Sequence, residues 1–133
     1  MRNVLGFGNR WYDAAVRTAE SVRLPSGRSI RLIAPPVFLA TKLEAFHGRG
    51  GGDFLASHDL EDVTVVIDGR PELVDEVATC EVALRSYLAD EIGSLLGNAA
   101  YLDALSGHLP GDEISQARLP IIRERLRLLT TPS

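Results

Sequence analysis

The sequence predicts a mostly helical α+β fold, in which an N-terminal β-hairpin over about 20–33 is followed by five or six helices. Two segments with alternating apolar residues flank the turn Pro-Ser-Gly-Arg at 25–28, which is the pattern of a hairpin. From residue 36 onward, apolar residues recur at helical spacing between glycines, prolines and N-cap residues. This second pattern is typical of successive amphipathic helices.

The length and composition indicate one globular domain. The chain has 133 residues, of which 45% are hydrophobic and 24% charged, and this is enough apolar content for one core. We expect a single domain over 1–133 with three parts. These are an extended arm, short helix and hairpin (1–35), a helix–glycine loop–helix core (36–77) and a helical C-terminal part (78–133).

Charge and cysteine content narrow the classes of protein. A net charge of −4 argues against a protein that coats nucleic acid, because such proteins are usually basic, although a local basic patch would still allow binding. Cys80 is the only cysteine, in an apolar setting that favours a buried structural thiol over a reactive one. The sequence has no signal-peptide pattern and no apolar run of ~20 residues. We therefore expect a cytoplasmic protein without a membrane segment.

The helices are expected between clear start and stop signals. A helix from Pro36 carries the apolar stripe Leu39, Leu43 and Phe46 and ends in a glycine run at 50–52. Ser57 is a good N-cap for a second helix that Gly69 ends. Further helical segments are expected over 71–77, 81–96 and 99–105, and from about 118 to the C-terminal end.

Lys42 is the first candidate site residue, because a lysine on an apolar stripe needs a partner or a route to water. Two interpretations stand side by side. In one, Lys42 forms an ion pair with Asp59 or Asp62 of the next helix; in the other, its ammonium binds a phosphate or a substrate oxygen.

The glycine run after Arg49 is the second candidate, because backbone amides of such loops can hold phosphate. It lacks the spacing of the common phosphate-binding motifs, so a helix end with a flexible loop is the favoured interpretation. His47, His58 and the acids of 53–62 surround it without a metal-binding spacing, so no metal site is predicted. Asp59 and Asp62 share one helical face. Stabilisation of the helix N-terminus by these carboxylates explains their position as well as a catalytic role does.

Three segments are informative when they are taken together: LGFGNRWY (5–12), ESVRLPSGRSIRLIAPP (20–36) and FLATKLEAFHGRGGGDFLASHDLEDVTVVIDGRPELVDEV (38–77). Together they resemble the C-terminal part of abortive-infection-type (AbiEii-like) nucleotidyltransferases. The resemblance implies a toxin of a toxin–antitoxin pair that moves a nucleotide from an NTP, with Mg²⁺, to RNA or protein. It also implies that Lys42, Arg49 and Asp53 contact nucleotide or phosphate, and that Asp59 or Asp62 supports catalysis.

The sequence departs from that family where the metal-binding carboxylates are expected. It contains no D-x-D pair, and the only acids before Lys42 are Asp13 and Glu20. It begins about where the strand with the family's third carboxylate should end. We therefore expect this chain alone to be inactive and to bind no cofactor, with Mg²⁺ and NTP bound only when a complementary core is present.

Three explanations for this departure remain open. The chain is one piece of a split or truncated enzyme completed by another chain, a degenerate homologue kept for binding, or a homo-oligomer that covers its hairpin edge or N-terminal arm. The expected partners are accordingly a complementary nucleotidyltransferase core, an antitoxin, or a second copy. The alternative function is a non-enzymatic oligomerising or partner-binding module derived from that fold.

Overall fold

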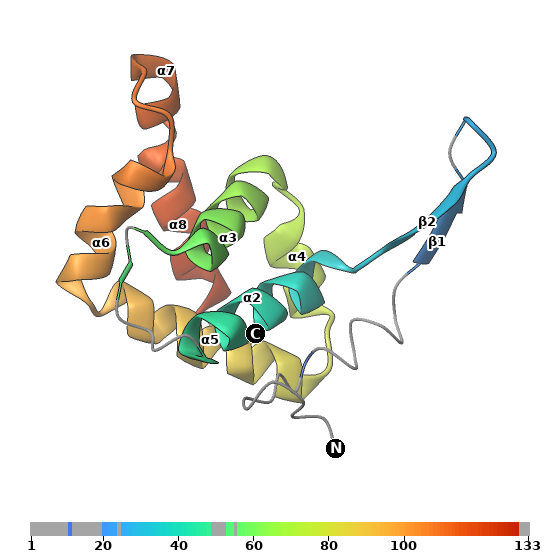
Figure 1. Cartoon of the computed structure of the whole chain (residues 1–133). Helices are drawn as coiled ribbons and strands as arrows, with labels where there is room; N and C mark the ends of the chain where they lie inside the picture. Colours follow the sequence, from blue (N-terminus) through green and yellow to red (C-terminus); the bar gives the residue numbers. More distant parts are fainter. Residues whose placement is uncertain (1–10, 12–19, 24, 49–52, 55, 131–133) are drawn as a thin grey trace.

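The structure is a computed structural model that describes residues 11, 20–23, 25–48, 53–54 and 56–130 (Figure 1). Its elements follow in chain order: β1 (Glu20–Arg23), β2 (Ser29–Leu32), α2 (Pro35–Gly48), α3 (His58–Gly69), α4 (Leu73–Ala78), α5 (Val82–Leu96), α6 (Ala99–Leu105), the 3-10 turn η1 (Ser106–His108), α7 (Glu113–Gln116) and α8 (Leu119–Leu129). The helices gather into one body, and the two strands extend away from it (Figure 1).

The predicted α+β class, with a hairpin over about 20–33 as its β part, is wrong. The described residues are mostly helical, and strand makes up only a small share of them. The two strands have four residues each and pair only with each other within the described part of the chain. Alternating sequence predicts extended backbone, but it does not say whether the strands join a sheet that packs on helices. The fold is a helical body with a two-stranded ribbon.

The ribbon is antiparallel and closes through a turn that needs glycine. The register pairs Glu20 with Leu32 and Arg23 with Ser29. Gly27 has φ of 91°, a conformation that side chains with a Cβ rarely adopt. Among the described residues, the strands make their substantial packing contacts with each other and not with the helices.

Helix α2 is the centre of the helical body. It packs against α3, α4 and α5, and α8 covers the other side of α3, α4 and α5. Leu39, Ala40 and Leu43 on α2 are buried, as are Leu88 and Ile92 on α5. One continuous apolar cluster therefore joins segments that lie more than forty residues apart in the sequence.

The ends of α3 are satisfied by polar groups. At the N-terminus, the Ser57 hydroxyl accepts a hydrogen bond from the backbone N–H of Leu60 at 3.1 Å, as predicted for an N-cap. At the C-terminus, Arg125 of α8 donates to the carbonyl oxygens of Ile67 and Asp68 at 2.9 and 2.8 Å.

Arg118, which directly precedes α8, donates to the Asp68 carboxylate at 2.6 Å. Cations are favoured at a helix C-terminus, where carbonyl groups lack partners, and the two arginines tie α8 to α3 there.

In the described part of the chain, no helix combines the length and the apolar character that crossing a membrane requires.

The packing of α5 gives a direct stability prediction. Replacing the fully buried Leu88 with alanine removes apolar contacts and leaves a cavity, so we expect a loss of about 2–5 kcal/mol in the free energy of unfolding. Val65→Ala is the control, because 64% of Val65 is exposed on α3, and its change should stay within about 0.5 kcal/mol. Urea denaturation followed by circular dichroism measures both. Equal effects would contradict the assigned core.

Candidate functional site

The best-defined polar cluster of the described chain is an ion-pair clamp between α2 and α3. The Nζ atom of Lys42 lies 2.8 Å from an Asp62 oxygen and 3.9 Å from an Asp59 oxygen. Asp59 and Asp62 stand three residues apart on α3, so both face α2. The Lys42 ammonium also lies 5.4 Å from the centre of the Phe38 ring, one turn earlier on α2. We call these four residues the lysine clamp.

The lysine clamp confirms the ion-pair interpretation of Lys42. The three charged side chains differ in exposure: 27% for Lys42, 11% for Asp59 and 45% for Asp62. Asp59 sits in the first turn of α3, where the helix dipole also favours its negative charge. Two carboxylates facing one ammonium leave the clamp with a net charge of −1. Phosphate binding by Lys42 stays a prediction.

The other predicted phosphate contacts lie apart from the clamp or outside the described chain. Arg49 and the glycine run at 50–52 are not among the described residues. Asp53 is exposed, and its Oδ1 accepts a hydrogen bond from the backbone N–H of Ala56 at 3.0 Å. This bond shapes the approach to α3. The structure thus brings together Lys42, Asp59 and Asp62 of the predicted set.

The histidines next to the glycine loop form separate pairs. His47 Nε2 contacts a carboxylate oxygen of Glu91 on α5. His58 Nδ1 lies 2.9 Å from Glu61 one turn later. Within the described residues, no group of three or more histidine, cysteine or acidic side chains is arranged to hold a metal ion.

His108 is a buried polar residue whose role the sequence does not reveal. Its Nε2 donates to the carbonyl oxygen of Phe54 at 2.8 Å, and its Nδ1 lies 3.3 Å from the Thr64 hydroxyl on α3. The Phe54 ring meanwhile packs against Phe46 and Tyr101. His108 therefore fixes the segment that leads into α3, and so helps to place the acids of the clamp. The partners are 44 and 54 residues away in sequence, so no local pattern predicts them.

Cys80 is half-buried two residues after α4 ends, and its Sγ donates to the carbonyl oxygen of Glu76 at 3.4 Å. Burial raises the pKa of the thiol above its ordinary value, which lowers its reactivity at neutral pH. The favoured interpretation of Cys80 as a structural thiol is consistent with this environment.

Comparison with known proteins identifies no relative. No family model, no curated protein and no solved structure matches the chain. The resemblance to abortive-infection nucleotidyltransferases consequently rests on the quoted sequence segments.

A double-mutant cycle measures whether the lysine clamp forms in solution. We expect Lys42→Met, Asp62→Asn and the double variant to give a coupling energy of about 0.5–1 kcal/mol, because water partly screens both side chains. The control pair is Arg127–Glu124 on α8, whose side chains are more exposed and should couple by at most about 0.3 kcal/mol. Urea unfolding gives both values, and a zero coupling for Lys42 and Asp62 would contradict the clamp.

Proposed function

We propose that this chain is the helical, non-catalytic part of an abortive-infection-type nucleotidyltransferase-like protein, and that it binds a catalytic core lying outside this sequence. The observation that carries the proposal is the β1–β2 ribbon, which stands away from the helical body (Figure 1). The sequence resemblance supplies the kind of partner, and the lack of a D-x-D pair supplies the reason for needing one.

The ribbon has the properties of a docking element. Each strand has a single strand neighbour among the described residues, so the outer edge of each presents backbone N–H and C=O groups. A two-stranded ribbon is only marginally stable in water by itself. Pairing with the edge strand of another sheet satisfies these groups and stabilises the ribbon. The sheet of a nucleotidyltransferase core is a partner of this kind.

The lysine clamp follows the ribbon closely in the chain. Helix α2 begins at Pro35, three residues after β2 ends at Leu32, and Lys42 follows two turns into the helix. At 1.5 Å per residue, Lys42 is about 10 Å along α2 from Pro35. A core docked on the ribbon would thus lie near an ammonium that is 27% exposed. In the assembled protein, Mg²⁺ and the NTP would bind the core. Lys42 and Arg49 would then contact phosphate, and Asp59 and Asp62 would orient Lys42.

A second candidate function is a partner-binding module with no role in catalysis. The charge balance of the lysine clamp favours it, because Asp59 and Asp62 already neutralise Lys42. In this second function the lysine clamp only joins α2 to α3. The ribbon still binds a partner, such as an antitoxin or a second copy of the chain. A single cysteine is compatible with the reducing cytoplasm, and we place the protein there under both candidate functions.

The test combines the purified chain with a core polypeptide encoded beside it that carries a glycine turn and a D-x-D pair. We expect the two to form a complex in size-exclusion chromatography with light scattering. We also expect Mg²⁺-dependent transfer of labelled nucleotide from NTP to RNA or protein by the mixture only. Transfer by this chain alone would contradict the proposal, as would an unrelated neighbouring coding sequence.

Two variants separate docking from catalysis in the same assay. Ser21→Pro removes a backbone N–H from β1 and should abolish the complex without changing the unfolding of the helical body, whereas Ser26→Ala in the turn is the control. Lys42→Met should keep the complex and lower transfer at least about tenfold. Undiminished nucleotide transfer by the complex with Lys42→Met would contradict a catalytic role of Lys42 and would favour the second candidate function.

A further inference from the structure

The β1–β2 ribbon is a cationic element of an acidic protein. Residues 20–33 contain a single acid against three arginines: Arg23, Arg28 and Arg31. Residues 34–133, by contrast, contain eight basic and sixteen acidic residues. Arg23 and Arg28 are exposed, and neither forms an ion pair with another described residue. Positive charge therefore gathers on the ribbon, away from the helical body (Figure 1).

The strand register places polar residues together on one face of the ribbon. Ser21 lies opposite Arg31, and Arg23 lies opposite Ser29. Residues opposite each other on two paired strands belong to the same face, as do residues two apart along one strand. These four residues therefore share one face, which holds two arginines and no acid. Arg28 directly precedes β2, so the third arginine lies near the tip of the ribbon.

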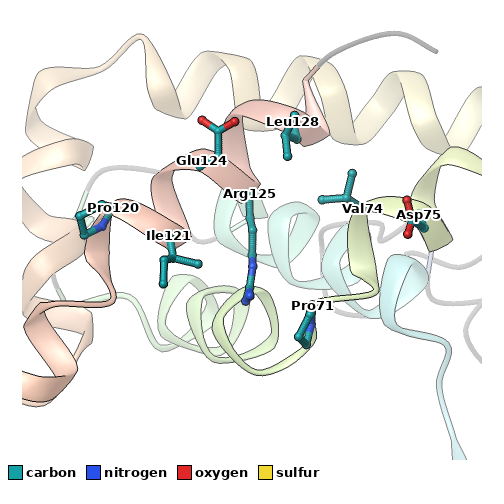
Figure 2. Close-up of a pocket in the computed structure, with 8 residues that line it drawn as sticks. All are labelled: Pro71, Val74, Asp75, Pro120, Ile121, Glu124, Arg125 and Leu128. Carbon is teal, nitrogen blue, oxygen red and sulfur yellow. The ribbon is translucent and has the colours of Figure 1, made fainter.

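Most arginines of the helical body, in contrast, bind groups of the chain itself. Arg70, Arg118 and Arg127 each pair with a carboxylate. The groove between α4 and α8, whose lining Figure 2 shows, contains one arginine beside two acids. This arginine, Arg125, donates to the carbonyl oxygens at the end of α3. An anionic partner is therefore expected at the ribbon and not at this groove.

We propose that the ribbon binds duplex DNA by entering the major groove, while its arginines bind the flanking phosphates. The major groove of B-DNA is about 12 Å wide and about 8.5 Å deep, and it admits a two-stranded β-ribbon. Strands about 4.8 Å apart fit this width. Each strand has four residues, and at about 3.3 Å per residue it is longer than the groove is deep. Arginine guanidinium groups bind phosphate oxygens in a bidentate manner.

The geometry favours duplex DNA over duplex RNA. The major groove of A-form RNA is deep and narrow, so a ribbon does not enter it. The ribbon also extends away from the acidic helical body (Figure 1). Salt screens the repulsion between that body and the phosphates beyond about 8 Å at physiological ionic strength. A net charge of −4 for the whole chain is therefore compatible with DNA binding at the ribbon.

This DNA contact goes beyond the function proposed above, and the two contacts exclude each other. Pairing with the edge strand of a core sheet adds about 4.8 Å to the width of a ribbon that already fills the groove. A core and a DNA duplex therefore compete for the ribbon. DNA binding by the chain alone requires no core, so each proposal can fail without the other.

The test is the fluorescence anisotropy of a labelled DNA duplex of about 20 base pairs, titrated with the full chain at about 50 to 200 mM salt. We expect a Kd of about 1–100 µM at the lowest salt concentration. The logarithm of the association constant should fall against the logarithm of the salt concentration with a slope of about −2.7, because three arginines contact phosphates.

Single arginine variants identify the contacts. Arg23→Gln and Arg28→Gln should each make this slope shallower by about 1. Arg123→Gln is the matched control, because Arg123 is exposed on α8 and its replacement changes the net charge equally. The control should leave the slope unchanged. Unchanged slopes in both ribbon variants would overturn the proposal, as would a control that weakens binding as much as they do.

A turn variant separates the ribbon geometry from its charge. Gly27→Val keeps every arginine but places a β-branched residue at a φ of 91°. It should weaken DNA binding at least about fivefold, because the strained turn opens the ribbon. Circular dichroism checks that the helical body stays folded. Undiminished binding by Gly27→Val would contradict the proposal, as would equal binding to an RNA duplex or no DNA binding at about 100 µM chain.

Discussion

The rest of the structure depends on the burial of α2 between α3, α4 and α5. Leu39, Ala40 and Leu43 occupy its inner face and are buried against these helices. Because these three residues make the apolar contacts of α2, Lys42 lies at the edge of that face, where α2 meets α3. The acids that open α3 meet it there. The packing of α2 thus determines the position of both the apolar core and the lysine clamp.

The same helix connects two parts of very different stability. Helix α2 contributes to a continuous apolar core. The ribbon, which precedes α2 in the chain, makes few contacts beyond the pairing of its own two strands. A hydrophobic body of this kind is expected to fold by itself, whereas a lone pair of strands is not. The contrast explains why we assign the ribbon to binding and the body to support.

Local signals in the sequence predict much of the helical body. Ser57 as an N-cap, Gly69 as a stop and the pairing of Lys42 with Asp59 or Asp62 all follow from spacing within one or two helices. The α+β class failed because alternation at 20–33 says nothing of what the strands pack against. His108 with Phe54, and Arg125 with the end of α3, could not be predicted, since each contact joins residues more than fifty positions apart.

Amide hydrogen exchange of the isolated chain tests the central claim most directly, namely that the ribbon needs a partner whereas the helical body does not. The account predicts that amides of β1 and β2 exchange within about tenfold of the rate of an unstructured peptide. Amides in the middle of α2 and α5 should exchange slower by a factor that approaches the global unfolding constant. Amides of β1 and β2 as protected as those of α2 would contradict the account, because the ribbon would then be stable with no partner.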